Sequence, residues 1–405
     1  MNDKAPITES EEFSTIEPAD AGDILMGYLG TTPPFGQLPQ RGERFWVDRP
    51  EQLAHAVHEL RQAHVVAVDA EFIQVRTRTP QEGSSSVPRL ALLQLAIEQR
   101  CFVVDTLRLH DLSPLAEVIS NPDVAILLHG AGADMRVMAE RNLHVMHYYD
   151  LEATSRSIFG QHESSLAAML RRAFGFHLDK SLQRTDWTRR PLPPAMVAYA
   201  ARDAEVTLAL YHWLNEHYHD ILQLHECTGE PEAVAVWIEP FLRGNAPLSP
   251  EMAVADAKSK GLVKNKNQIM ADCRAALTTV THPMRKSRLL RLIADLSLVQ
   301  LVPDLMPLLE ARTSDERAGS ARTLGRLNVQ SAQDAITLLL ADPVQDVRKA
   351  AQTALRNLQT REPRQQRALP TRAADGTRSW SVENTIQSPD DENGWKSRLR
   401  SIIDA

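Results

Sequence analysis

The segment Val65-Val66-Ala67-Val68-Asp69-Ala70-Glu71-Phe72 decides the fold and supplies the first two candidate site residues. Its short run of valines and alanine predicts a buried central strand. Because side chains alternate between the two faces of a strand, we expect Asp69 and Glu71 on one face, about 7 Å apart. Two desolvated carboxylates repel each other, and a cation bound between them would stabilise both. Taken alone, however, an Asp-x-Glu pair is more typical of a solvated strand end.

The patterns around this strand predict a sheet domain at residues 44–222. A helix is expected at 51–63, and a Ser/Gly-rich loop at 80–88 should lead into strands at 90–97 and 101–105, which complete a three-strand meander. Further strands are expected at 125–129 and 145–149, and further helices at 112–120, 133–141, 151–158, 165–174 and 194–217. This mixture predicts an α/β fold in which helices flank a mixed central sheet.

The segments outside the sheet domain differ from it in composition. Residues 1–43 are acidic, contain Pro and Gly, and lack sustained periodicity, so we expect a loosely ordered leader. Residues 223–262 are expected to form a linker or helical connection. Residues 361–405 are polar and of mixed charge, and we expect them to be disordered.

An internal similarity divides the helical residues 263–360 into repeats. Residues 314–327 match residues 345–358 at an offset of 31, and a helix pair at 284–296 and 298–311 precedes them. Helical hairpins that recur at this period predict an all-α, HEAT-like helical domain. The alternative is a helical bundle in which the similarity is accidental.

The composition of the chain limits which binding partners and which cellular location can be expected. The net charge of −7 gives no overall basic signature, so nucleic-acid binding would need a local basic surface. No apolar run reaches about 18 residues, so no membrane-spanning helix and no membrane partner are expected. The three cysteines are far apart, which excludes a cysteine-based zinc site and suits a reducing, cytoplasmic location.

Two further acidic positions accompany the first pair. Asp134 lies where a strand ends and a helix begins, a position that stabilises a carboxylate. Tyr199 and Asp203 are four residues apart on a helix, so they share a face, and a phenol beside a carboxylate can order a water molecule. Each position alone suits a structural role. Together they fit two-metal hydrolysis of a phosphodiester, with Mg²⁺ or Mn²⁺ as the metal that oxygen ligands prefer.

These residues resemble the three motifs of the DEDD exonuclease superfamily in its tyrosine-bearing branch. Asp69-Ala-Glu71, the His129-x-x-x-x-Asp134 segment and Tyr199-x-x-x-Asp203 occur in the family order. The loop at 180–192 is similar to a loop of ribonuclease D, and the resemblance covers about residues 60–220. Ribonuclease D commonly carries a different helical C-terminal domain, whose pattern does not occur after residue 245.

The resemblance implies a ribonuclease-H-like fold, two divalent metal ions and 3′-5′ exonuclease activity. Carried over to this sequence, it implies that four acids hold the metals and that Tyr199 orients the attacking water. The four are Asp69, Glu71, Asp134 and Asp203. Substrate contacts are predicted, against the alternatives of core packing or a solvated loop, for Phe72, His129, Lys180, Arg184 and Arg190.

The predicted function is that of a metal-dependent 3′-5′ exoribonuclease that trims RNA ends and releases nucleoside 5′-monophosphates. One alternative is a DNA exonuclease on the same fold. Another is an inactive exonuclease-like scaffold whose repeats bind a protein partner. The cations of the repeats either solubilise the domain or guide long RNA toward the metal site. They are Arg285, Lys286, Arg288, Arg291, Arg317, Arg322, Arg326, Arg348, Lys349 and Arg356.

Overall fold

The structure, a computed structural model, describes most of the chain between residues 33 and 380. The described residues are 33–38, 42–79, 83–179, 181–182, 185–229, 232–359, 370–372 and 378–380. The chain divides into two units, Met1–Leu358 and Gln359–Ala405. In the second unit, β8 (Pro370–Arg372) pairs with β9 (Arg378–Trp380) in an antiparallel ladder. Most of the predicted leader and tail lie outside the described residues.

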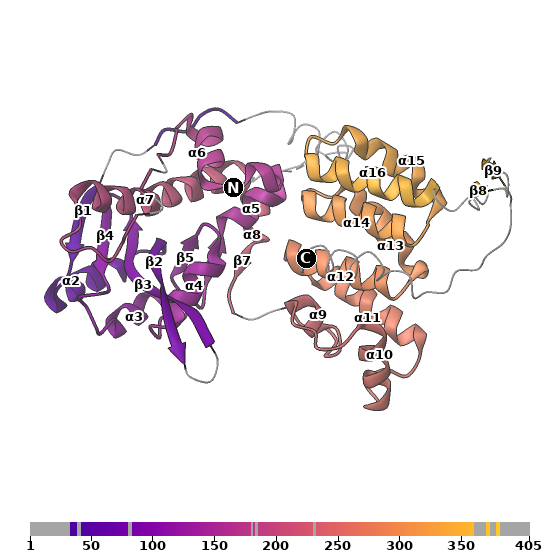
Figure 1. Ribbon diagram of the computed structural model, residues 1–405, viewed down its shortest axis with the longest axis horizontal. Coiled ribbons are helices and arrows are strands. Elements are labelled where there is room, and N and C mark those ends of the chain that lie inside the picture. The colour runs from indigo at the N-terminus through magenta and orange to yellow at the C-terminus, as the bar shows by residue number, and fades with distance from the viewer. Residues whose placement is uncertain are drawn as a thin grey trace, which may run out of the picture. The chain divides into compact units, whose positions relative to one another are not determined.

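A seven-stranded mixed sheet forms the centre of the first part of the chain (Figure 1). Its order is β1-β4-β3-β2-β5-β6-β7. The strands are β1 (Glu43–Val47), β2 (Val65–Thr79), β3 (Gly83–Ile97), β4 (Arg100–Asp105), β5 (Ala125–Leu128), β6 (Tyr148–Asp150) and β7 (Glu226–Cys227). The predicted meander β2-β3-β4 is antiparallel, whereas β1, β5 and β6 each run parallel to a neighbour. The predicted mixed sheet is therefore confirmed.

The β2–β3 hairpin is longer than the sequence predicted. We expected a loop at 80–88, but the ladder continues from Ile73↔Arg89 to Thr79↔Gly83. The serines of this segment have little tendency to form strands alone, and pairing with β2 supplies the backbone hydrogen bonds that keep them extended. The hairpin projects beyond the rest of the sheet (Figure 1). The short strands β1 and β7 were also not predicted.

Helices cover both faces of the sheet. On one face lie α5 (Leu151–Phe159), α6 (Leu166–Phe174), α7 (Pro194–His217) and α8 (His219–Gln223). On the other lie α2 (Pro50–Leu60), α3 (Ala116–Ile119) and α4 (Ala131–Ala139). Strand β2 contributes to both cores in alternation, with Ala67 on the α7 face and Val66, Val68 and Ala70 on the α4 face. This period of two places Asp69 and Glu71 on the face that α7 covers.

The C-terminal part of the first unit is entirely helical, and we call residues 237–359 the helical array. Its helices are α9 (Glu239–Arg243), α10 (Pro250–Ser259), α11 (Lys266–Thr279), α12 (Pro283–Asp295), α13 (Val302–Leu305), α14 (Ser314–Arg326), α15 (Gln333–Leu338) and α16 (Gln345–Gln359). They stack side by side around one apolar core (Figure 1). Helices α12, α14 and α16 begin at 283, 314 and 345, so each starts 31 residues after the previous one.

One helix expected within the array is broken. Residues 298–311 were predicted as a single helix, but they form the 3-10 helix Val299–Leu301, then α13, then the 3-10 helix Met306–Glu310. Pro303 and Pro307 explain the breaks, because proline has no N–H to donate and its ring crowds the preceding turn.

Arg317 of α14 is buried in the core of the array, where it binds Asp342, a residue shortly before α16. The side chain is only 1 % exposed, and its Nε lies 2.7 Å from Oδ2 of Asp342. The guanidinium also donates to the carbonyl oxygens of Ala311 and Arg312, at 2.9 and 3.0 Å. Removing one partner of such a buried pair is costly, because the other charge then stays buried without compensation.

Several polar contacts connect the array to the sheet domain, among them Ser157–Asp315, His162–Lys349 and the Asp220–Arg312 ion pair. The Ser314 hydroxyl, at the start of α14, donates to the Arg156 carbonyl of α5 at 3.0 Å. The Gln161 N–H, just beyond α5, donates to the Asp346 carboxylate at 2.7 Å. Helix α5 and the residues just beyond it therefore make most of these contacts, and Asp220 of α8 makes another. None of the described helices is long and apolar enough to span a membrane.

Candidate active site

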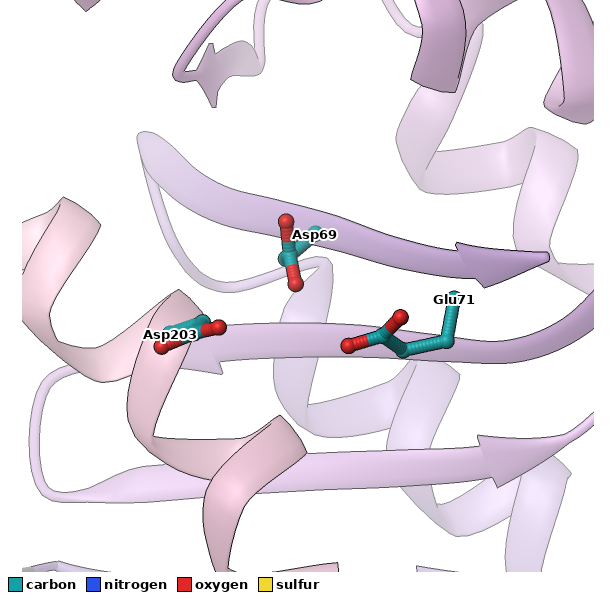
Figure 2. A group of neighbouring side chains, drawn as sticks. All are labelled: Asp69, Glu71 and Asp203. Carbon is teal, nitrogen blue, oxygen red and sulfur yellow. The ribbon is translucent and has the colours of Figure 1, made fainter. Parts of the chain in front are cut away.

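Strand β2 and helix α7 bring three carboxylates together. One carboxylate oxygen each from Asp69, Glu71 and Asp203 lies within 4.8 Å of the other two. Figure 2 shows the three carboxyl groups facing a common space between the strand and the helix. Ala200 and Ala204, on the face of α7 that packs on the sheet, are fully buried. Their small side chains allow α7 to lie close to the sheet, so Asp203 can reach the acids of β2.

Asp134 belongs to α4, which packs on the other face of the sheet from α7. It lies in the first turn of α4 and is only 8 % exposed. Its charge acts on Glu71 and is itself acted on by Asp69. Among the described residues, Asp134 does not belong to the group within 4.8 Å. It therefore lies beside the three-carboxylate group and adds a fourth acid to the site.

A carboxylate that the sequence did not single out fixes the start of α4. Asp150, the last residue of β6, accepts hydrogen bonds from the N–H groups of Gly130 and Ala131, at 3.1 and 3.4 Å. It also accepts from Glu152 and Ala153 in the first turn of α5, at 3.1 and 3.2 Å. One side chain thus satisfies the free N–H groups of two helices. The available signal was an Asp directly before a predicted helix, which is typical of an N-cap.

Burial makes this cluster unfavourable as a set of bare anions. It raises the pKa of Asp69 to about 6 and that of Asp134 to about 8. Glu71 has its pKa raised to about 9, first by burial and then by the charges of Asp69, Asp203 and Asp134. A divalent cation removes this penalty, because it stabilises the ionised form of every carboxylate that it contacts. The all-oxygen donor set fits a hard cation such as Mg²⁺ or Mn²⁺.

Tyr199 lies one helical turn before Asp203, on the same side of α7. Burial, the charges of Asp203 and Glu71, and a hydrogen bond with Asp203 together raise the pKa of Tyr199. The phenol therefore stays protonated at neutral pH and can act as a hydrogen-bonding group. The ring of Trp187, which is 2 % exposed, lies 6.2 Å from the Tyr199 ring, centroid to centroid, and supports its position.

Three residues predicted to bind substrate make structural contacts. Phe72 packs against the core on the α4 face, away from the carboxylates. A ring nitrogen of His129, Nε2, lies 3.0 Å from the carbonyl oxygen of Ser164. The guanidinium of Arg190 binds Asp105 through two nitrogens, at 2.6 and 2.7 Å.

Arg190 is therefore bound within the protein, and its contact with a phosphate is not supported by this geometry. Its Nη1 also donates to the Trp187 carbonyl at 2.8 Å, so it fixes the segment before α7. Asp105 lies at the end of another strand, so no local pattern around Arg190 could reveal this partner. The two other predicted contacts, Lys180 and Arg184, lie outside the described residues.

Many cations of the array have partners inside the protein. Besides Arg317, Arg285 pairs with Glu232 and Glu239, and Lys286 pairs with Glu316. Arg288 donates to the Leu242 carbonyl, Arg348 to the Pro343 carbonyl, and Arg291 and Arg326 both lie near Asp295. These contacts explain the presence of the cations without a nucleic acid.

The sheet domain is the part of the chain that is similar to the relatives described here. Residues 45–218 match the family model described as 3′-5′ exonuclease. An exosome complex component 10 homolog from Drosophila melanogaster is 31% identical over 181 residues, which are 44% of this chain and 19% of that protein. A ribonuclease D from Gluconacetobacter diazotrophicus is 30% identical over 168 residues, 41% of each protein. The chain thus spans about two fifths or less of the length of these relatives.

A solved structure matches a longer part of the chain. The match with the crystal structure of Escherichia coli RNase D covers 89% of this chain and 84% of the RNase D chain. The sequence identity is 20% and the TM-score is 0.41.

Proposed function

We propose that this chain, which carries a 3′-5′ exonuclease domain of the ribonuclease D and Rrp6 kind at residues 45–218, removes nucleotides from RNA 3′ ends. The products would be nucleoside 5′-monophosphates. The observation that carries the proposal is the convergence of Asp69, Glu71 and Asp203 on one space, with Asp134 and Tyr199 beside it. This arrangement has the donors for divalent cations and a neutral hydroxyl group next to them.

Four carboxylates would hold two divalent cations, Mg²⁺ or Mn²⁺. Asp69, Glu71 and Asp203 supply oxygens that are already close together, and Asp134 supplies a fourth carboxylate. The chemistry supplied by the bound cations would be a lowered pKa of the attacking water and neutralisation of charge on the leaving oxygen.

Tyr199 would orient the attacking water. Its raised pKa keeps the hydroxyl group protonated, so it is a poor base but a good hydrogen-bonding partner. The hydroxyl group is held by Asp203 and the ring by Trp187, so its direction is fixed before substrate binds. Because Tyr199 has already lost its conformational freedom in the folded protein, that loss of entropy does not add to the barrier of the reaction.

RNA is the proposed substrate because the relatives include ribonuclease D and an exosome component homolog. The alternative is a DNA exonuclease, since a metal site of carboxylates does not itself distinguish a 2′-hydroxyl. The decisive test is digestion of single-stranded RNA and DNA of one sequence, with Mg²⁺, with Mn²⁺ and with excess EDTA. We expect RNA to be shortened stepwise from its 3′ end and EDTA to stop the reaction. Faster digestion of DNA would refute the substrate assignment, and activity in EDTA would refute the metal site.

For the helical array we propose HEAT-like repeats that bind a protein partner. The 31-residue spacing of α12, α14 and α16 supports the repeats. The internal pairing of most array cations favours a protein partner over RNA guidance. A test is the double variant Arg322→Glu and Lys349→Glu, which reverses two exposed charges. We expect its affinity for a long RNA, and the salt dependence of that affinity, to match the wild type; a flatter salt dependence would favour RNA guidance.

We also propose a cytoplasmic location. Its support is that Cys101, Cys227 and Cys273 are all free thiols, which suits a reducing compartment.

A further inference from the structure

A glutamine lies in the middle of an otherwise apolar strand, directly beside the acid cluster. Residues 90–97 of β3 read Leu-Ala-Leu-Leu-Gln-Leu-Ala-Ile, and Gln94 is the polar residue among them. Gln94 is 0 % exposed. Neither its Nε2 nor its Oε1 has a hydrogen-bond partner among the described residues. An apolar side chain would suit this position better, so the amide needs an explanation.

The cost of this amide is substantial in physical terms. A buried polar group that loses its hydrogen bonds costs about 1–3 kcal/mol, and Gln94 presents both a donor and an acceptor. In native proteins such groups are rare and often mark a functional site.

The register of the sheet places Gln94 next to a candidate metal ligand. Gln94 on β3 is the cross-strand partner of Asp69 on β2. Side chains of directly paired residues point to the same face of a sheet, with Cβ atoms about 4.5–5.5 Å apart. Ala96, two residues along β3, packs in the core on the α7 face, so Gln94 shares that face with Asp69 and Glu71.

Helix α7 closes the space above this pair with small side chains. Ala200, Ala201 and Ala204 are fully buried in the same core. Water is therefore excluded from the amide of Gln94, and a hydrogen bond made there would be strong.

We propose that Gln94 is a positioning residue whose amide N–H donates to the ionised carboxylate of Asp69 and fixes its orientation toward a bound cation. This inference rests on the proposed function, because only a metal-loaded site requires the half-buried Asp69 to stay charged beside two other carboxylates. Side chains that orient metal ligands in this manner typically contribute about 10–100-fold to metal affinity. Gln94 acts through Asp69 and does not itself touch the metal or the substrate.

The test compares Gln94→Met with Leu93→Met in the whole 405-residue chain. Methionine is close to glutamine in shape but has no amide. Leu93 is the neighbouring residue, equally buried, and packs on the opposite face, so Leu93→Met is a matched control. Mn²⁺ affinity is measured by isothermal titration calorimetry, and the melting temperature is measured without metal. We expect Gln94→Met to weaken Mn²⁺ binding about tenfold or more and to melt no lower than the wild type without metal. Leu93→Met should bind Mn²⁺ like the wild type.

Wild-type Mn²⁺ affinity in Gln94→Met would overturn the inference. So would a lower melting temperature of the metal-free Gln94→Met, because the amide would then have a partner that does not depend on metal. Failure of the wild type to bind Mn²⁺ would instead refute the proposed metal site.

Discussion

Replacing one acid of the cluster should stabilise the metal-free protein while abolishing its activity. We choose Asp203→Asn, because Asp203 comes from a different element than Asp69 and Glu71 and the substitution preserves shape. At 4.8 Å, the limit that encloses the three carboxylate oxygens, two unit charges repel by about 3.5 kcal/mol at an effective dielectric constant of about 20. Water screens these partly exposed groups, and Glu71 is largely protonated at pH 8, since its pKa is raised to about 9. We therefore expect a net gain of about 2 kcal/mol in the free energy of unfolding at pH 8, which raises the melting temperature by about 5 °C.

The pH dependence of this effect has a definite sign. Asp69, Glu71 and Asp134 each have a higher pKa in the folded protein than in the unfolded chain, so the folded state binds protons more tightly. The stability that these groups contribute is complete below their unfolded pKa of about 4 and is lost as pH rises through the folded values. Those values are about 6 for Asp69, about 8 for Asp134 and about 9 for Glu71. The difference in the free energy of unfolding between Asp203→Asn and the wild type should thus be small at pH 5 and increase toward pH 9.

The assay is thermal melting of EDTA-treated protein, repeated with added Mn²⁺ and combined with RNA digestion. Glu216→Gln is the control, because it removes an exposed acid from the same helix, with a side chain 75% exposed. The wild type and the control should melt at higher temperature with Mn²⁺, whereas Asp203→Asn should gain little and should turn over RNA slower by orders of magnitude. The reasoning is refuted if metal-free Asp203→Asn melts below the wild type, or if it keeps full activity.

Three further substitutions test separate parts of the structure. Tyr199→Phe should lower kcat strongly and leave KM nearly unchanged if the hydroxyl only orients water, and steady-state kinetics that show an unchanged kcat would make Tyr199 a packing residue. Asp150→Asn should weaken Mn²⁺ binding, measured by calorimetry, because the start of α4 loses a charged partner and Asp134 loses its fixed position; unchanged affinity would contradict this role. Arg317→Met should lower the free energy of unfolding in urea by about 3 kcal/mol or more, because Asp342 stays buried without its cation. The double variant with Asp342→Leu should recover much of that loss, and a failure to recover would mean that the carbonyl contacts of Arg317 matter more.

Periodicity in the sequence was sufficient to predict the main strands and helices. The alternation along β2 placed Asp69 and Glu71 on one face, and the observed bounds of α7, Pro194–His217, are those predicted. The offset of 31 between two segments reappears as the spacing of helix starts. These features depend on contacts between residues that are close in the chain, or on repetition, and both are visible in a sequence.

The parts that were missed depend on partners far away in the chain. Arg190 binds Asp105, which lies 85 residues earlier, and Asp150 reaches back 20 residues to Gly130. Strand β1 exists because it pairs with β4, which lies more than 50 residues later. No local pattern carries such information. The phosphate contact predicted for Arg190 rested on its charge and its place in the loop at 180–192, and neither could reveal the Asp105 partner.

Asp150 has a consequence for the protein as a whole. Because its carboxylate binds the first turns of α4 and α5 together, neither helix can shift without disturbing the other. Helix α5 in turn is bonded to the array through the Arg156 carbonyl and Ser314. A displacement of the array is thus transmitted to Asp134 through three connected elements, α14, α5 and the start of α4. We therefore expect that a partner bound to the array changes the position of Asp134, and with it the rate of RNA digestion.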